Sequence, residues 1–147
     1  MTNDKQKYIL FSAILCSALL LSLANNKSRS KENNFVKIEK DTKLFEKGKN
    51  LFIKNCTSCH YIGMDKVATA PALGGITKTR KKDWLYNYTR NSYQMFENGD
   101  SIATKIREKG WGLMTSFPKL TNSDLDAIYY FVEKNHELPE KEKIRKY

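Results

Sequence analysis

Five consecutive residues carry the side chains best suited to chemistry, and they read Cys56, Thr57, Ser58, Cys59 and His60. The pattern C-x-x-C-H is the attachment site of a c-type haem. Two thiols that lie one helical turn apart reach the two vinyl groups of one porphyrin, and the histidine that follows then lies under the iron. The motif therefore predicts one haem c, bound covalently through Cys56 and Cys59, with His60 as an iron ligand.

Two other interpretations of the motif are weaker. A zinc site needs three or four protein ligands, but the chain has only three Cys and two His, and His136 lies far along the sequence beyond a helix. A thioredoxin-like redox pair belongs beside a βαβ pattern, whereas a helical pattern precedes Cys56 and a loop follows His60. The local pattern therefore favours haem over zinc or a redox disulfide.

The elements that must position the motif are helices, because we find no useful run of alternating apolar and polar residues that would indicate a strand. Apolar residues recur with helical spacing in four stretches. The first starts near Asp41, the second covers 82–91, the third covers 101–109 and the fourth starts at Thr121. The residues that favour the start of a helix are Asp41, Asp100 or Ser101, and Thr121 paired with Asp124. Gly110 favours the end of one. The segment 61–79 is rich in Gly, Ala and Pro, and we expect a loop there.

The first 24 residues are predicted to be a signal peptide or a membrane anchor. The uncharged apolar run 8–24 is only just long enough for a helix that spans a membrane. Ser22 and Ala24 suit cleavage by a signal peptidase after Ala24. Lipidation of Cys16 is a third and weaker interpretation. All three place the rest of the chain in the periplasm or another extracytoplasmic compartment.

The remaining chain is expected to divide into three parts: a flexible polar linker at 25–39, one helical domain at 40–138 and a charged tail at 139–147. The formal charge of the 147 residues is +10. Basic and acidic residues are interleaved, and an exported protein does not meet nucleic acid, so a nucleic-acid partner is not expected. Because the leader, linker and tail hold part of the charge, it is a weak guide to the partner.

Several segments together resemble a class I c-type cytochrome, of the mitochondrial and bacterial cytochrome c family. The segments are, in order, GKNLFIKNCTSCH (48–60), PALGG (71–75), Trp84-Leu85, NGD (98–100) and MTSFPKLTNSDLDAIYYFVE (114–133). The resemblance covers essentially all of 40–138. It implies an all-α, cytochrome c-like fold, with about four helices packed around one covalently attached haem.

The resemblance also implies a crossing of the first and last helices. Gly48 and Phe52 would lie on the first helix where it meets Ile128 and Phe131 of the last. A side chain at Gly48 would hold the two helices apart. Glycine inside a helix costs about 1 kcal/mol relative to alanine, and the close crossing explains why that cost is accepted.

The same resemblance implies how the haem would be held on its two faces. The carbonyl of Pro71 would accept a hydrogen bond from His60 and orient its ring, and Leu73 would press on the haem. Met114, which precedes Phe117-Pro118, would be the second axial ligand.

Other residues remain candidates for the second axial ligand or for contacts with the haem. Met95 could equally fill a gap in the core, Met64 is tied to the His60 side of the haem, and a vacant position is also open. His136 is also an alternative for the second axial ligand, although the favoured interpretation is a solvated surface residue. The candidates near the haem or its propionates are Trp84, Tyr88, Trp111 and Arg80.

The implied function is electron transfer rather than enzymatic catalysis. With His/Met ligation, a monomeric cytochrome would exchange single electrons with redox proteins such as a membrane respiratory complex, an oxidase or a reductase. One alternative is a haem subunit of a respiratory complex tethered by residues 8–24. A less favoured alternative is a haem enzyme or gas sensor with an open sixth position.

Overall fold

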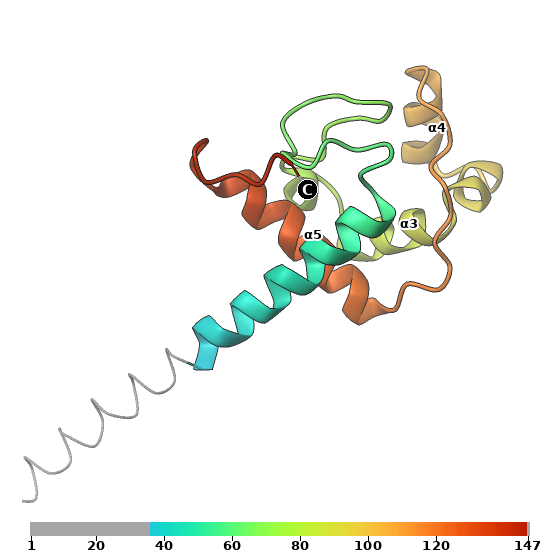
Figure 1. Ribbon diagram of the computed structural model, residues 1–147. Coiled ribbons are helices and arrows are strands. Elements are labelled where there is room, and N and C mark those ends of the chain that lie inside the picture. Colours follow the sequence, from blue (N-terminus) through green and yellow to red (C-terminus); the bar gives the residue numbers. More distant parts are fainter. Residues whose placement is uncertain (1–35, 147) are drawn as a thin grey trace, which may run out of the picture. The chain divides into compact units, whose positions relative to one another are not determined.

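The structure is a computed structural model that describes residues 36–146, and it divides the chain into two compact units, Met1–Asp41 and Thr42–Tyr147. Residues 36–146 contain helices and no strand, so the expected all-α class is confirmed. The helices are a first helix over 36–55, α2 (Ile76–Thr79), α3 (Lys82–Glu97), α4 (Ser101–Glu108) and α5 (Asn122–Glu137) (Figure 1).

The first helix begins earlier than expected. Asp41 lies inside the helical residues 36–55, so its prediction as an N-cap is wrong, and residues 36–39 of the expected flexible linker are helical. The residues between 36 and 47 include neither Gly nor Pro, and Glu39 precedes Lys43 by four positions, a spacing that favours a helix. The predicted leader and the linker as far as residue 35 lie outside the described residues.

Within residues 36–146, no helix is long and apolar enough to cross a membrane. The apolar run 8–24 lies outside that range, so its prediction as a leader or an anchor stays a prediction.

The prediction for α3 was too short. The helix was expected over 82–91, but it continues to Glu97 after a break at Asn91, whose backbone is not helical (φ −158°, ψ 75°). The Asn91 side chain then accepts a hydrogen bond from the N–H of Gln94 at 3.1 Å, as an N-cap residue does. In addition, the short helix α2 lies within the segment 61–79 that was expected to be a loop.

The predicted start signals of the last two helices are confirmed. Asp100 caps α4, and its Oδ1 accepts hydrogen bonds from the N–H groups of Ile102 (3.1 Å) and Ala103 (2.8 Å). Thr121 and Asp124 form a capping box at the start of α5. These bonds satisfy N–H groups that have no partner within the helix.

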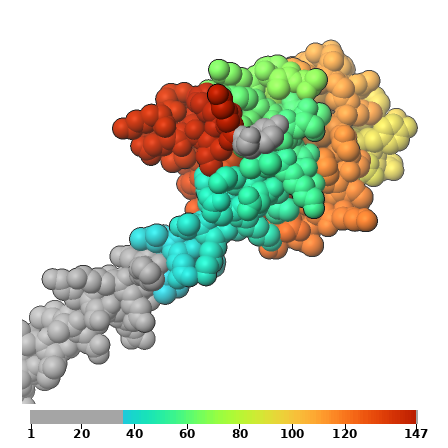
Figure 2. Space-filling view, in the orientation of Figure 1, coloured from blue at the N-terminus to red at the C-terminus, as the bar shows by residue number. Residues whose placement is uncertain are grey.

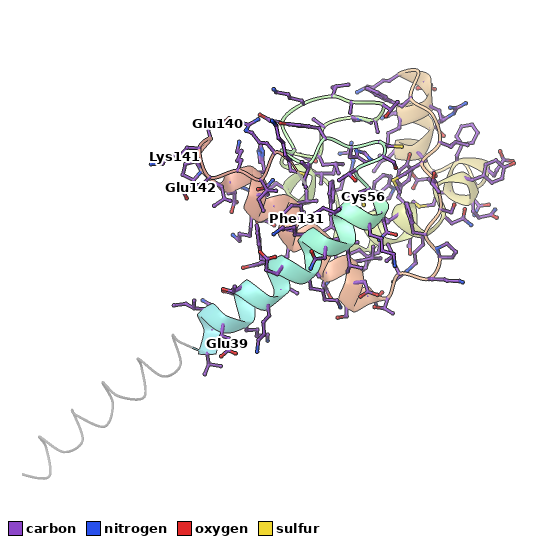
Figure 3. The ribbon with its side chains drawn as sticks, viewed as in Figure 1. Glu39, Cys56, Phe131, Glu140, Lys141 and Glu142 are labelled. Atoms are coloured by element: carbon purple, nitrogen blue, oxygen red, sulfur yellow. The ribbon has the colours of Figure 1, made fainter. Side chains whose placement is uncertain are left out.

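The first helix crosses α5 at Gly48, as expected. A Cβ atom on Gly48 would lie 1.9 Å from the backbone O of Ala127 and 2.8 Å from Cβ of Phe131. One turn further on, the rings of Phe52 and Phe131 pack with their centroids 5.6 Å apart. Figure 3 shows Phe131 at this crossing and Cys56 at the end of the first helix. The crossing therefore places the motif next to the core.

The charged tail is docked against the domain rather than free of it. The buried amide of Asn135 in α5 donates to the carbonyls of Ile62 (2.8 Å) and Ile144 (3.1 Å), and its oxygen accepts from the N–H of Ile144 (2.8 Å). Arg145 donates to Tyr61 Oη. Figure 2 shows the C-terminal residues beside the loop that follows the motif. The tail and Asn135 therefore brace that loop.

Candidate haem-binding site

The Cys-x-x-Cys-His motif forms a tight turn at the end of the first helix. The N–H groups of Cys59 and His60 both donate to the carbonyl of Cys56, at 3.1 and 2.9 Å. Thr57 ties the same turn to the helix by donating its hydroxyl to the carbonyl of Ile53 at 2.8 Å. The turn that follows the helix therefore holds the two cysteines three residues apart on one tight turn.

Cys56 is half-buried and Cys59 is exposed. Burial, and to a smaller extent the neighbouring Cys59, raises the pKa of the Cys56 thiol to about 12, so Cys56 is protonated at neutral pH. Among residues 36–146, no three His, Cys, Asp or Glu side chains gather closely enough to hold a metal ion.

The side chain of His60 is oriented by a backbone carbonyl. Its Nδ1 lies 2.9 Å from the O atom of Pro71. Because a carbonyl oxygen can only accept, Nδ1 carries the hydrogen and Nε2 keeps its lone pair for a ligand. Burial lowers the pKa of His60, although the hydrogen bond to Pro71 acts in the opposite sense. The neutral imidazole that an iron ligand requires is therefore the favoured form.

Two buried polar atoms within α2 and directly after it would suit the acidic groups of a haem. Nε of Arg80 and Oγ1 of Thr77 are buried and have no hydrogen-bond partner within the described part of the chain. A propionate would satisfy both donors. The indole N–H of Trp84 is not available, because it already donates to the two carboxylate oxygens of Asp100 at 3.0 and 3.1 Å. Together with the two thiols and His60, these donors fit a haem.

Met114 lies half-buried in the irregular loop between α4 and α5. The loop is held by α3, because the fully buried Ser92 donates its hydroxyl to the carbonyl of Met114 at 2.7 Å. The N–H of Phe117 donates to the carbonyl of Thr89 at 3.1 Å. Ser92 and Thr89 were not predicted to contact this loop, since nothing in the residues around them indicates the break in α3.

The other candidates for the second iron ligand lie in surroundings that differ from those of Met114. Met64 is fully buried in the core with Phe52 and Phe131, and Met95 is half-buried within α3. The expectation of a solvated His136 is wrong: its ring lies so close to the backbone that a Cβ on Gly74 would be 2.6 Å from it. The Nδ1 atom of His136 is buried without a hydrogen-bond partner among the described residues.

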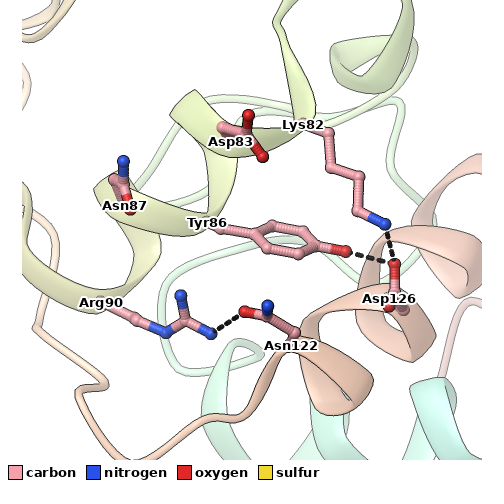
Figure 4. Close-up of a pocket in the computed structure, with 7 residues that line it drawn as sticks. All are labelled: Lys82, Asp83, Tyr86, Asn87, Arg90, Asn122 and Asp126. Carbon is pink, nitrogen blue, oxygen red and sulfur yellow. Dashed lines mark hydrogen bonds and ion pairs between the residues drawn. The ribbon is translucent and has the colours of Figure 1, made fainter.

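A polar hollow on the surface is separate from the motif. It has a volume of about 660 Å³ and is lined by polar residues of α3 and α5 (Figure 4). Its charged groups are largely paired with one another: Lys82 and Tyr86 both contact Asp126 at 2.5 Å, and Arg90 bonds to Asn122 at 2.6 Å. None of the motif residues lines it. The hollow therefore lies between α3 and α5 and is not the haem site.

Comparison with known proteins agrees with this geometry. The sequence model of the family described as cytochrome c matches residues 45–136. Cytochrome c6 from Microcystis aeruginosa is 33% identical over 86 residues, which span 58% of this chain and 89% of that protein.

Solved structures agree as well. Cytochrome c from Rhodothermus marinus matches with a TM-score of 0.58 at 26% identity, covering 66% of this chain and 80% of that one. An engineered cytochrome c from the same organism matches with a TM-score of 0.57 at 26% identity, covering 67% of this chain and 82% of that one. The expected cytochrome c-like fold is therefore confirmed. The chain belongs to the cytochrome c family of haem electron carriers, and Cys56 and Cys59 are the pair that binds its one haem c covalently.

Proposed function

We propose that the domain carries single electrons between redox proteins, with His60 and Met114 as the two axial ligands. The haem, when bound, supplies the exchange between Fe(III) and Fe(II). The observation that carries the proposal is the 2.9 Å contact between His60 Nδ1 and Pro71 O. It leaves Nε2 as a neutral ligand on the residue directly after the cysteine pair.

Met114 is proposed as the second ligand because its surroundings suit that role better than those of the other methionines. Its loop is irregular and half-buried but is tied to α3, whereas Met64 is enclosed in the protein core. A thioether is neutral and soft, so it stabilises Fe(II) and raises the potential. Such a carrier accepts electrons readily from low-potential donors.

The residues around the site would tune and protect the haem. Leu73 and Ile76 are half-buried apolar residues beside the core, and they would exclude water from the ring. Arg80 and Thr77 would neutralise or bond the propionates through their unpartnered donors. Exclusion of water and the placement of charge both act on the reduction potential.

The proposed partners are redox proteins with an acidic docking face. Lysines near an exposed haem edge would steer such a face and accelerate encounter at low salt. With both axial positions filled, iron has no open site for a substrate, so we propose electron transfer without enzymatic turnover. A haem enzyme or gas sensor would need that site to be open.

A redox titration of the holoprotein tests the electron-carrier proposal. We expect one reversible transition with the slope of a single-electron couple, and one set of isosbestic points between the oxidised and reduced spectra. The double variant Cys56→Ala/Cys59→Ala is the control, and it should retain no haem after denaturation. Several transitions, or steady consumption of peroxide by the wild-type protein, would contradict a simple one-electron carrier.

We further propose that residues 1–24 direct the domain to the periplasm or another extracytoplasmic compartment. The support is the apolar run 8–24 behind Lys5 and Lys7. If the run stays attached, residues 25–39 would tether the domain to the membrane and raise its effective concentration near a partner complex.

The N-terminus of the mature protein, mapped by mass spectrometry after expression in a host that attaches haem c, distinguishes the two forms. An N-terminus at Asn25 is expected for a cleaved, freely diffusing carrier. An intact N-terminus together with recovery in the membrane fraction would instead show a tethered domain. Recovery in the cytosol with residues 1–24 intact would contradict export.

A further inference from the structure

The bend in α3 lies beside residues that bond to the Met114 loop rather than only within the helix. Asn91 leaves the helical conformation (φ −158°, ψ 75°) in the middle of α3. In a regular helix each carbonyl accepts from the N–H four residues later. At the bend, the carbonyl of Thr89 instead accepts from Phe117, a residue of the Met114 loop.

Two groups at the bend bond to the loop, one at Met114 and one three residues after it. The hydroxyl of Ser92 donates to the carbonyl of Met114 itself at 2.7 Å. The carbonyl of Thr89 accepts from Phe117, three residues further on, at 3.1 Å. Ser92 and Thr89 are both buried, and a buried hydrogen bond is costly to lose because its groups find no water in exchange.

A third group holds the far end of the same loop. Arg90 donates from Nε to the carbonyl of Leu120 at 3.0 Å. Its Nη2 donates to the side chain of Asn122 at 2.6 Å (Figure 4). The segment 89–92 therefore provides four hydrogen bonds that run from Met114 to the first residue of α5. We call this segment the latch.

The loop depends on this support because its own backbone provides little. Residues 111–117 have no regular secondary structure, and such a segment opens more readily than a helix. Hydrogen bonds from residues outside the loop therefore largely determine its position relative to the core.

We propose that the latch, residues 89–92, sets how firmly Met114 is presented as an axial ligand, and that Ser92 is its central positioning residue. The inference rests on the proposed ligation by Met114. A loosened latch would let the loop leave, so that a ligand from solution could occupy the sixth position. The effect should be larger in the ferric protein, because a thioether binds Fe(III) less well than Fe(II).

Competition by imidazole in the ferric holoprotein measures the latch directly. Ser92→Ala should raise the apparent affinity for imidazole roughly five- to tenfold, which is the loss expected from one net hydrogen bond. The titration follows the weak thioether-to-iron absorption band. Ser116→Ala, the same change at an exposed position of the same loop, is the matched control and should titrate like the wild type.

Arg90→Lys provides a second variant that leaves the buried part of the latch intact. Lysine keeps the charge but not the two-pronged contact with Leu120 and Asn122, so we expect a smaller rise in imidazole affinity. This variant keeps the proposal testable if Ser92→Ala does not fold.

The outcomes separate the latch from the ligand assignment. If Met114→Leu lacks the thioether band but both Ser92→Ala and Arg90→Lys bind imidazole as the wild type does, the latch is refuted and ligation by Met114 stands. A loss of unfolding stability without a change in imidazole affinity also refutes it, because Ser92 is then only structural. If Met114→Leu keeps the band, the ligand assignment fails, and the latch fails with it.

Discussion

Gly48→Ala should destabilise the protein strongly, although alanine is the better helix former. The added Cβ would lie 1.9 Å from the Ala127 carbonyl oxygen and 2.8 Å from Cβ of Phe131, and neither atom is the end of a flexible side chain. Overpacking a core in this way costs about 3 kcal/mol, and the gain in helix propensity offsets only about 1 kcal/mol. We expect a net loss of about 2 kcal/mol in the free energy of unfolding.

Denaturant unfolding of the holoprotein, followed by circular dichroism, measures this loss. Gly112→Ala is the matched control, because a Cβ there would have no atom within 4 Å, and its stability should change by less than about 0.5 kcal/mol. An unchanged unfolding midpoint for Gly48→Ala would show that the first helix and α5 do not cross as closely as the structure has them.

Met114→Leu should produce the largest functional effect. Leucine has nearly the volume of methionine, so the loop keeps its packing while the thioether is lost. We expect the thioether-to-iron band of the ferric protein to disappear. The midpoint potential should fall by on the order of 0.1 V, since axial ligands move haem potentials within a range of about 0.8 V.

Spectroelectrochemistry measures the band and the potential in one experiment. Met95→Leu makes the same change at a half-buried position inside α3, and it should leave both unchanged. A reversal of the two results would assign the ligand to Met95.

Local signals in the sequence predicted the parts of the fold that depend on neighbouring residues. The Thr121–Asp124 capping box and the cap at Asp100 are of this kind, because the capping bonds themselves join residues within one helix turn. The motif itself is equally local. The pairing of Gly48 with Phe131 was foreseen only through the family resemblance.

Long-range hydrogen bonds determine the features that the sequence did not reveal. The tail is held by Asn135, whose partners Ile62 and Ile144 are far away in the sequence or beyond a helix end. The latch joins Ser92 to Met114, 22 positions later. A serine or asparagine in a helix has no spacing that names such a distant partner.

Mixing the ferrous wild-type protein with carbon monoxide tests the central claim most directly, because it asks whether the sixth position is closed. With His60 and Met114 both bound, no carbon monoxide spectrum should appear within seconds of mixing, whereas Met114→Leu should bind the gas at once. If the wild type binds carbon monoxide as fast as Met114→Leu does, the sixth position is open, and the account of a closed electron carrier is contradicted.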